Sequence, residues 1–93
     1  MSADVVKVRW HLIDGDNRDV TADPDGYALA TWARAWHGDT MTMVASFHRA
    51  GSWSVHDSDL PLPEGAKDRS FGFLDDALAW LGEQRGVRYE VAR

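Results

Sequence analysis

Three histidines are the side chains of this sequence best suited to chemistry, because each falls in a segment where polar and apolar residues alternate. They are His11, His48 and His56. Alternate residues of a strand share one face of a sheet, so we expect all three on one polar face, together with Arg9. Imidazoles act as metal ligands, general bases and pH-sensitive groups. Alternation does not fix their mutual distances, so we interpret this face as a binding surface and assign no catalytic residue and no metal ligand.

Other motifs for catalysis or metal binding are weak or missing. The acidic run 14–19 has carboxylates at alternate positions, but an EF-hand loop would need an oxygen donor and a glycine where this chain has Arg18 and Asp19. The chain has no cysteine, which excludes thiolate nucleophiles and cysteine-bound zinc. It also has no Gly-x-Ser-x-Gly elbow and no glycine-rich phosphate loop. We therefore predict no cofactor.

Two further groups of side chains are suited to contact with a partner. Leu60 and Leu62 alternate with prolines in an expected loop over residues 57–70, and proline lowers the entropy that such a segment loses on binding. The alternative is a crossover segment that packs on its own domain. Trp80 lies at the edge of the apolar stripe of an expected helix, where it serves either the core or an interface.

Composition and charge limit the class of protein. The chain has 93 residues, of which 44% are hydrophobic and 27% charged, and this composition predicts a single globular domain over residues 1–93. The net charge is −5 and the arginines are scattered, which argues against binding to nucleic acid. No segment is long and apolar enough to span a membrane or to serve as a signal peptide. We expect a cytoplasmic protein with a protein partner, and self-association remains open.

The alternating and helical patterns predict most of the secondary structure. Strands are expected over residues 5–13, 40–48, 53–56 and 87–91. In the second of these, Met41 and Met43 are expected to face the core. A helix is expected near residues 74–85, because Leu74, Ala77, Leu78 and Leu81 form one apolar stripe.

The segment 23–36 fits two structures. As a helix, it has Asp23 as N-cap, Pro24 in the first turn, and Leu29, Trp32, Ala33 and Trp36 on one apolar stripe. As a strand, it would place Arg34 between two tryptophans on one face. The alanines favour the helix, and we predict a helix that buries Trp32 and Trp36.

These elements predict an α+β fold with the order β-α-β-β-α-β, the ferredoxin-like arrangement, in which two helices cover one face of a small sheet. The alternative is a β-meander with one C-terminal helix, in which residues 27–36 form a strand. In the ferredoxin-like arrangement the histidine face is the open face of the sheet, and in either topology the class is α+β.

The leading functional hypothesis is a small acidic domain, not an enzyme, that binds or regulates a protein partner. The bias towards Ala, Asp, Arg and Gly with few lysines is typical of GC-rich genomes such as those of actinobacteria and their phages. An inhibitor encoded by a phage or mobile element fits this description, as does a cellular accessory protein. The competing hypothesis is a small hydrolase or metal-dependent enzyme that uses the histidine face.

Overall fold

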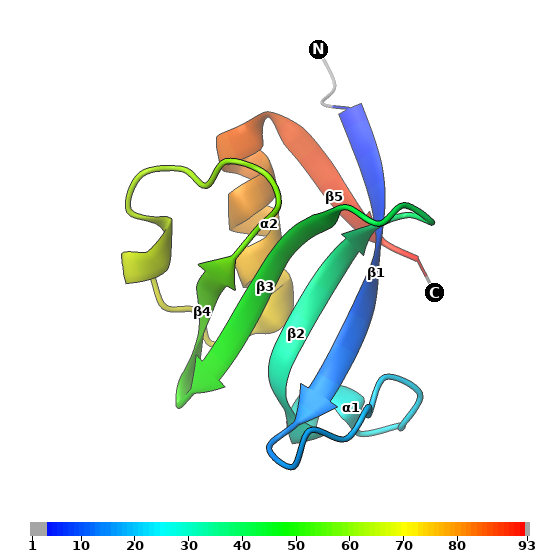
Figure 1. Ribbon diagram of the computed structural model, residues 1–93. Coiled ribbons are helices and arrows are strands. Elements are labelled where there is room, and N and C mark those ends of the chain that lie inside the picture. Colours follow the sequence, from blue (N-terminus) through cyan, green and yellow to red (C-terminus); the bar gives the residue numbers. More distant parts are fainter. Residues whose placement is uncertain (1–3, 93) are drawn as a thin grey trace.

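The chain forms a mixed sheet of five strands with one long helix against one of its faces, as the computed structural model shows (Figure 1). The structure describes residues 4–92. The elements are β1 (Asp4–Asp14), α1 (Gly26–Leu29), β2 (Ala30–His37), β3 (Met43–Ala50), β4 (Ser52–Asp57), the 3-10 turn η1 (Ala66–Asp68), α2 (Leu74–Arg85) and β5 (Val87–Val91).

The strand order is β4-β3-β2-β1-β5, with β5 parallel to β1 and all other neighbours antiparallel. The loop after β4 and the helix α2 therefore carry the chain from one edge of the sheet to the other. Gly82 permits the close approach of α2 to β5, because a Cβ atom at this position would lie 2.8 Å from the carbonyl oxygen of Val87.

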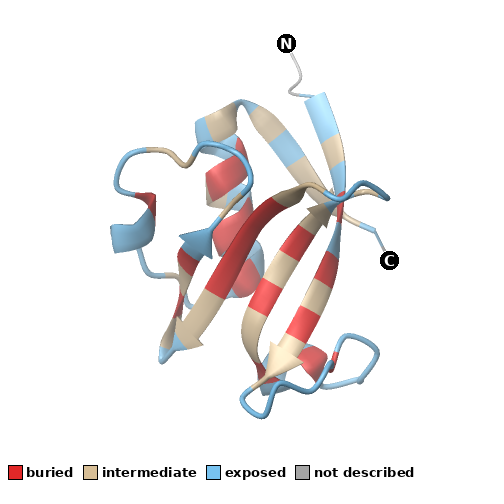
Figure 2. Cartoon of the chain, in the orientation of Figure 1, coloured by how far each residue is buried: buried red, intermediate tan, exposed pale blue. Residues whose placement is uncertain are grey.

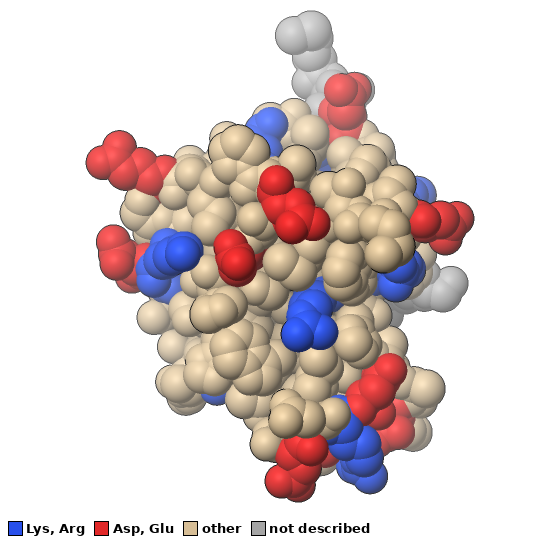
Figure 3. All heavy atoms as spheres, in the orientation of Figure 1, with Lys and Arg blue, Asp and Glu red and all other residues tan. Residues whose placement is uncertain are grey.

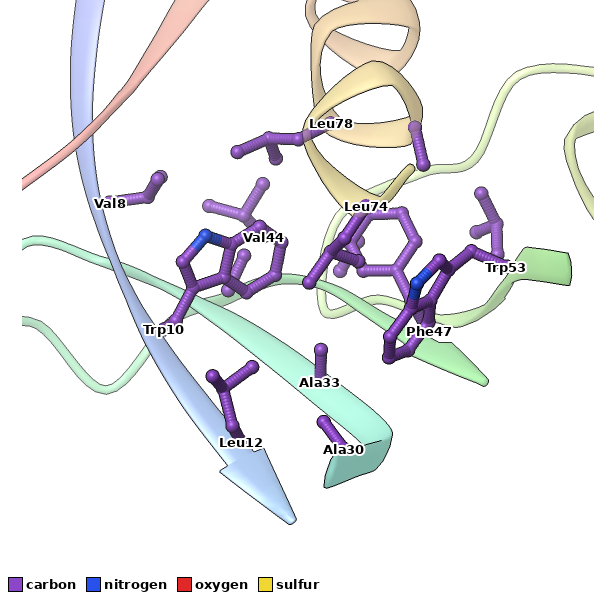
Figure 4. Close-up of a cluster of buried hydrophobic side chains, with 14 of the residues drawn as sticks. Val8, Trp10, Leu12, Ala30, Ala33, Val44, Phe47, Trp53, Leu74 and Leu78 are labelled. Carbon is purple, nitrogen blue, oxygen red and sulfur yellow. The ribbon is translucent and has the colours of Figure 1, made fainter. Parts of the chain in front are cut away.

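The core lies between the sheet and α2 (Figure 4). Trp10, Phe47 and Trp53 project from the strands towards Leu74 and Leu78 of the helix. The rings of Trp10 and Phe47 meet edge to face, with their centroids 5.8 Å apart, a favourable geometry for aromatic pairs. Two indoles thus supply much of the volume that closes this small core.

Several predicted elements agree with the structure. β1, the β3–β4 hairpin, α2 and β5 all occur within a few residues of the expected ranges. Four residues of the predicted stripe of α2 are buried: Leu74, Ala77, Leu78 and Leu81. The buried and partly exposed residues that alternate along β1 and β2 are visible in Figure 2.

The predicted ferredoxin-like arrangement with two helices is wrong. Residues 26–29 form a single helical turn, and residues 30–37 form β2, the central strand of the sheet. Trp32 and Trp36, expected in the core, lie partly exposed on the face opposite α2. The alternative topology with a strand at 27–36 is closer to the observed one, although β5 follows its helix.

Pairing on both sides explains why this segment is a strand. β2 pairs with β1 from Ala30 to His37 and with β3 from Trp32 to Trp36, so its backbone groups are satisfied by two neighbours. A helix of similar length is marginal without tertiary packing. Ala33 and Ala35, which favoured the helix, are fully buried beneath α2, where their small size leaves room for the large core residues.

The methionines were also placed on the wrong face. Met41 lies outside the strand with 86% of its surface exposed, and Val44 is buried instead of Met43. The register between β2 and β3 shifts between Ala35 and Trp36. Such a bulge changes the face that the following residues occupy, and strict alternation does not reveal it.

Candidate functional site

The face of the sheet opposite α2, which we call the open face, carries an unusual set of partly exposed side chains. Its central strand contributes Trp32, Arg34 and Trp36, none of which is buried. The neighbouring strands add, in register with these three, Arg9, His11, Ile13, Met43, Ser46, His48 and Ser54. His56 of β4 contacts Trp32 from a position where the β3–β4 register is irregular.

Trp32 brings two of the predicted histidines together. Its ring centroid lies 4.3 Å from that of His48 on β3 and 4.8 Å from that of His56 on β4. The His56 ring meets the indole edge to face, at 82°. The histidines therefore form two sides of an aromatic cluster centred on the indole, and neither has a carboxylate partner among the described residues.

His11 lies on the same face but outside this cluster. It is paired across the sheet with Arg34, one row away from Trp32. Its Nε2 atom lies 3.5 Å from Oδ2 of Asp19. Hydrogen bonds from Thr21 lower the pKa of the Asp19 carboxyl, and the nearby His11 lowers that pKa further. The three predicted histidines thus share a face, but only His48 and His56 converge.

Arg9, also predicted on this face, is held against the second tryptophan. Its guanidinium carbon lies 5.9 Å from the centre of the Trp36 ring, within the range of a cation–π contact. Its Nε donates to the carbonyl oxygen of Gly38, at 2.9 Å. Gly38 adopts a φ of 51° in the turn after β2, a conformation suited to glycine.

The open face is hollowed next to Trp32. The hollow has a volume of about 430 Å³. Its lining consists of Ile13, Asn17, Trp32, Arg34, Met43, Ser46, His56 and Asp57. Its wall thus combines an indole, a guanidinium, an imidazole and a carboxylate, which can bind a ligand by stacking, ion pairing and hydrogen bonding together.

The loop that borders this hollow is ordered by carboxylates of the acidic run. Oδ1 of Asp14 accepts hydrogen bonds from the backbone N–H groups of Asp16 and Arg18, both at 2.9 Å. These bonds, chiefly the one from Arg18, lower the pKa of the Asp14 carboxyl. The acidic run therefore caps its own backbone, and Asn17 lies within this turn with a φ of 63°.

Acid should destabilise the fold in part through Asp14. Its pKa is lower in the folded state, so its stabilising contribution is complete above the ordinary carboxyl pKa of about 4 and is lost as the pH falls through the folded-state value. We expect Asp14→Asn to reduce the loss of stability between neutral and acid pH. Urea unfolding at a series of pH values measures this loss. Asp16→Asn is the control and should keep the acid dependence of the wild type; equal slopes for all three proteins would contradict the role of Asp14.

The other predicted binding residues lie away from the open face. Leu62 is half-buried and packs against the core, whereas Leu60 is exposed. Trp80 is half-buried and packs against Phe71, and the guanidinium of Arg69 lies 4.9 Å from its ring centre. Leu62 and Trp80 therefore have contacts within their own domain, and Leu60 alone of the three extends into solvent.

Trp32, Arg34 and Trp36 were not predicted from the sequence as surface residues. Their signal was the alternating run Trp-Ala-Arg-Ala-Trp over residues 32–36, which fits a strand. The charge between two tryptophans weighed against that interpretation, because it would have placed a charge in a core. On the open face the same order leaves the charge and both indoles partly exposed.

Neither a metal-ligand cluster nor a membrane-spanning helix occurs within residues 4–92. No group of three or more His, Cys, Asp or Glu side chains in this range is arranged to hold a metal ion. None of the helices in this range has the length and apolar character needed to cross a membrane.

Comparison with protein family models, with curated proteins and with solved structures found no match to this chain.

Proposed function

We propose that this protein is a binding or regulatory domain, not an enzyme, that contacts a protein partner through the open face. The observation that carries the proposal is the row Trp32, Arg34 and Trp36 on the central strand, half-exposed and flanked by His48 and His56. Residues that decide binding energy in interfaces are enriched in tryptophan and arginine and lie near the interface centre. The solvated face of an antiparallel sheet usually carries polar side chains. Two indoles at the centre of such a face therefore favour an interface.

The distribution of charge supports a protein partner over nucleic acid. On the side of the molecule shown in Figure 3, acidic side chains are interspersed with the basic ones and no continuous basic area occurs. The net charge of −5 would repel a phosphate backbone. A role in the cytoplasm, as a phage-encoded inhibitor or a cellular accessory protein, is part of this proposal.

Replacement of both central tryptophans should remove partner binding without unfolding the domain. We expect Trp32→Ala with Trp36→Ala to abolish capture of the partner from a lysate of the source organism, because each such anchor contributes about 2 kcal/mol or more. The measurement is affinity capture followed by mass spectrometry, with circular dichroism to verify the fold.

The control is Phe73→Ala, which removes an exposed aromatic residue, 74% accessible, at the start of α2. Phe73 lines a separate groove of about 340 Å³ and should be dispensable. A partner that is lost on Phe73→Ala and retained by the double variant would contradict the proposal.

A further inference from the structure

We propose that Arg34 binds a carboxylate from an Asp or Glu side chain in a peptide segment of the partner protein. This inference rests on the proposed function and specifies the chemistry of the partner. Arg34 lies in the middle of β2, with β1 on one side and β3 on the other. Its guanidinium lines the hollow beside Trp32.

Arg34 differs from the other arginines of residues 4–92 in having no partner within that range. The others donate to backbone carbonyls, pair with carboxylates or lie over aromatic rings: Arg9, Arg18, Arg49, Arg69, Arg85 and Arg88. For Arg34 the structure shows no hydrogen bond, ion pair or ring contact. A guanidinium presents its donors in a planar fork that matches a carboxylate. Arg34 is half-buried, and its guanidinium, which has no partner within residues 4–92, can therefore bind a carboxylate from another molecule.

The surroundings of Arg34 favour a peptide as the source of that carboxylate. The indole of Trp32 and the side chains of Ile13 and Met43 line the same hollow, and they provide an apolar surface for the residues next to the acidic one. Removal of water by such neighbours strengthens the ion pair. A free inorganic anion would use the guanidinium but leave this apolar wall exposed.

Asp57 disfavours a polyanion in the same hollow. Its carboxylate accepts a hydrogen bond from the backbone N–H of Ser58, and it lines the hollow together with Arg34. Ser46 lies between the two in the sheet register. Successive phosphates of a nucleic acid would place a negative charge near Asp57, whereas a peptide with one acidic residue can offer Asp57 an N–H donor. Repulsion of the wrong ligand is a common source of specificity.

The overall negative charge does not prevent this pairing. Interactions between charges more than about 8 Å apart are largely screened at physiological ionic strength. The electrostatic energy of a bound carboxylate therefore depends mainly on the nearby Arg34 guanidinium. The distant acidic groups slow the encounter. We therefore expect binding of an acidic segment to depend on Arg34 more than on net charge.

The experiment selects binders from a random peptide library displayed on phage, in parallel on wild-type protein and on Arg34→Gln. We expect peptides that bind the wild type to be enriched in Asp or Glu next to apolar residues, and no such enrichment on the variant. The best peptide and its Glu→Gln or Asp→Asn counterpart are then titrated into ¹⁵N-labelled protein. The acidic peptide should bind at least about tenfold more tightly, since hydrogen bonds between charged groups are roughly twice as strong as neutral ones, and it should shift the indole N–H signal of Trp32.

Two variants serve as controls. Arg88→Gln removes an exposed arginine that pairs with Glu90, and it should leave binding unchanged. Arg34→Lys keeps the charge without the planar fork and should retain part of the affinity. The amide spectrum of each variant shows that the fold is intact.

Each of the following results would overturn the inference. One is equal affinity for the acidic peptide and its amide counterpart. Another is selection of the same acidic peptides by Arg34→Gln. The third is tighter binding of inorganic phosphate than of the acidic peptide. Apolar or basic peptides that still bind at Trp32 would overturn the inference and leave the proposed function standing, whereas peptides and partner that bind only near Phe73 would overturn both.

Discussion

Phe47→Ala should lower the free energy of unfolding by about 3–5 kcal/mol. Phe47 has no exposed surface and is the largest of the fully buried side chains. It meets Trp10 edge to face from the sheet side of the core, so its removal leaves a cavity that α2 and the neighbouring strands cannot fill. A domain of this size has a total stability of about 5–15 kcal/mol, and the variant should therefore lose a large part of it. Urea unfolding followed by tryptophan fluorescence measures the loss.

Phe73→Ala is the matched control for this change. It deletes the same side chain from an exposed position and should alter stability by less than about 0.5 kcal/mol. Phe47→Leu keeps most of the volume and gives a measurable variant if Phe47→Ala does not fold. A similar small effect of all three substitutions would contradict the described core.

Arg85→Ala should have the second largest effect, with a loss of about 2–4 kcal/mol of stability. The Arg85 guanidinium of α2 donates to four acceptors, on β3, on β5 and in the loop after β4. Nη1 donates to the carbonyl oxygen of Val44 at 2.8 Å and to the hydroxyl of Tyr89 at 3.2 Å. Nη2 donates to Oγ of Ser58 at 3.1 Å and to the carbonyl oxygen of Pro61 at 3.0 Å. Truncation would remove all four bonds; the Val44 oxygen would keep only its bond from Ser58 Oγ, and Ser58 Oγ only its bond from the Leu60 N–H.

The loop after β4 should respond most to this variant. Because Arg85 holds Ser58 and Pro61, hydrogen exchange should become faster in residues 58–63 of Arg85→Ala, while the middle of β2 stays protected at low denaturant. Arg85→Lys should lose less stability than Arg85→Ala, since the ammonium group keeps the charge and can still donate to some of the acceptors, but it should remain below the wild type, since it cannot reach all four at once. Arg88→Ala removes an exposed arginine three residues along the chain and should change stability by less than about 1 kcal/mol. An Arg85→Ala protein as stable as Arg88→Ala would contradict the stabilising role of the four Arg85 hydrogen bonds.

The two sets of predictions separate stability from binding. Phe47 and Arg85 contribute nothing to the open face, and their variants test the scaffold. Trp32, Trp36 and Arg34 are partly exposed, and their replacement should affect binding far more than folding. Variants of Phe47 and Arg85 should lose partner binding only to the extent that they unfold. Variants of Trp32, Trp36 and Arg34 should lose binding while they remain folded. Both results together would support the assignment of the open face.

The elements with one dominant pattern were predictable from the sequence. Leu74, Ala77, Leu78 and Leu81 form a single helical stripe, and they are buried as expected. His11, His48 and His56 lie on one face because alternation in β1, β3 and β4 is a local property of extended chains. The buried positions of Trp10 and Trp53 follow from the same alternation.

Residues 30–37 show where local pattern is insufficient. Their alanines and their spacing satisfy a helix as well as a strand, and the difference in local propensity is small. Two flanking strands supply hydrogen-bond partners along both edges of β2. The stabilisation from these bonds comes from other parts of the chain and cannot be inferred from the local sequence pattern. Tertiary pairing therefore decided the strand, and with it the exposure of Trp32, Arg34 and Trp36.

The sequence by itself thus determined which segments alternate, which helix forms near the C-terminus and which histidines share a face. Only the tertiary structure decided that β2 lies at the centre of the sheet. It also decided that a bulge buries Val44 in the core in place of Met43. Arg34, beside Trp32, has no partner within residues 4–92 for the same reason. The reason is physical: side-chain periodicity is set within a few residues, whereas strand order, register and the pairing of charges depend on groups brought together from distant parts of the chain.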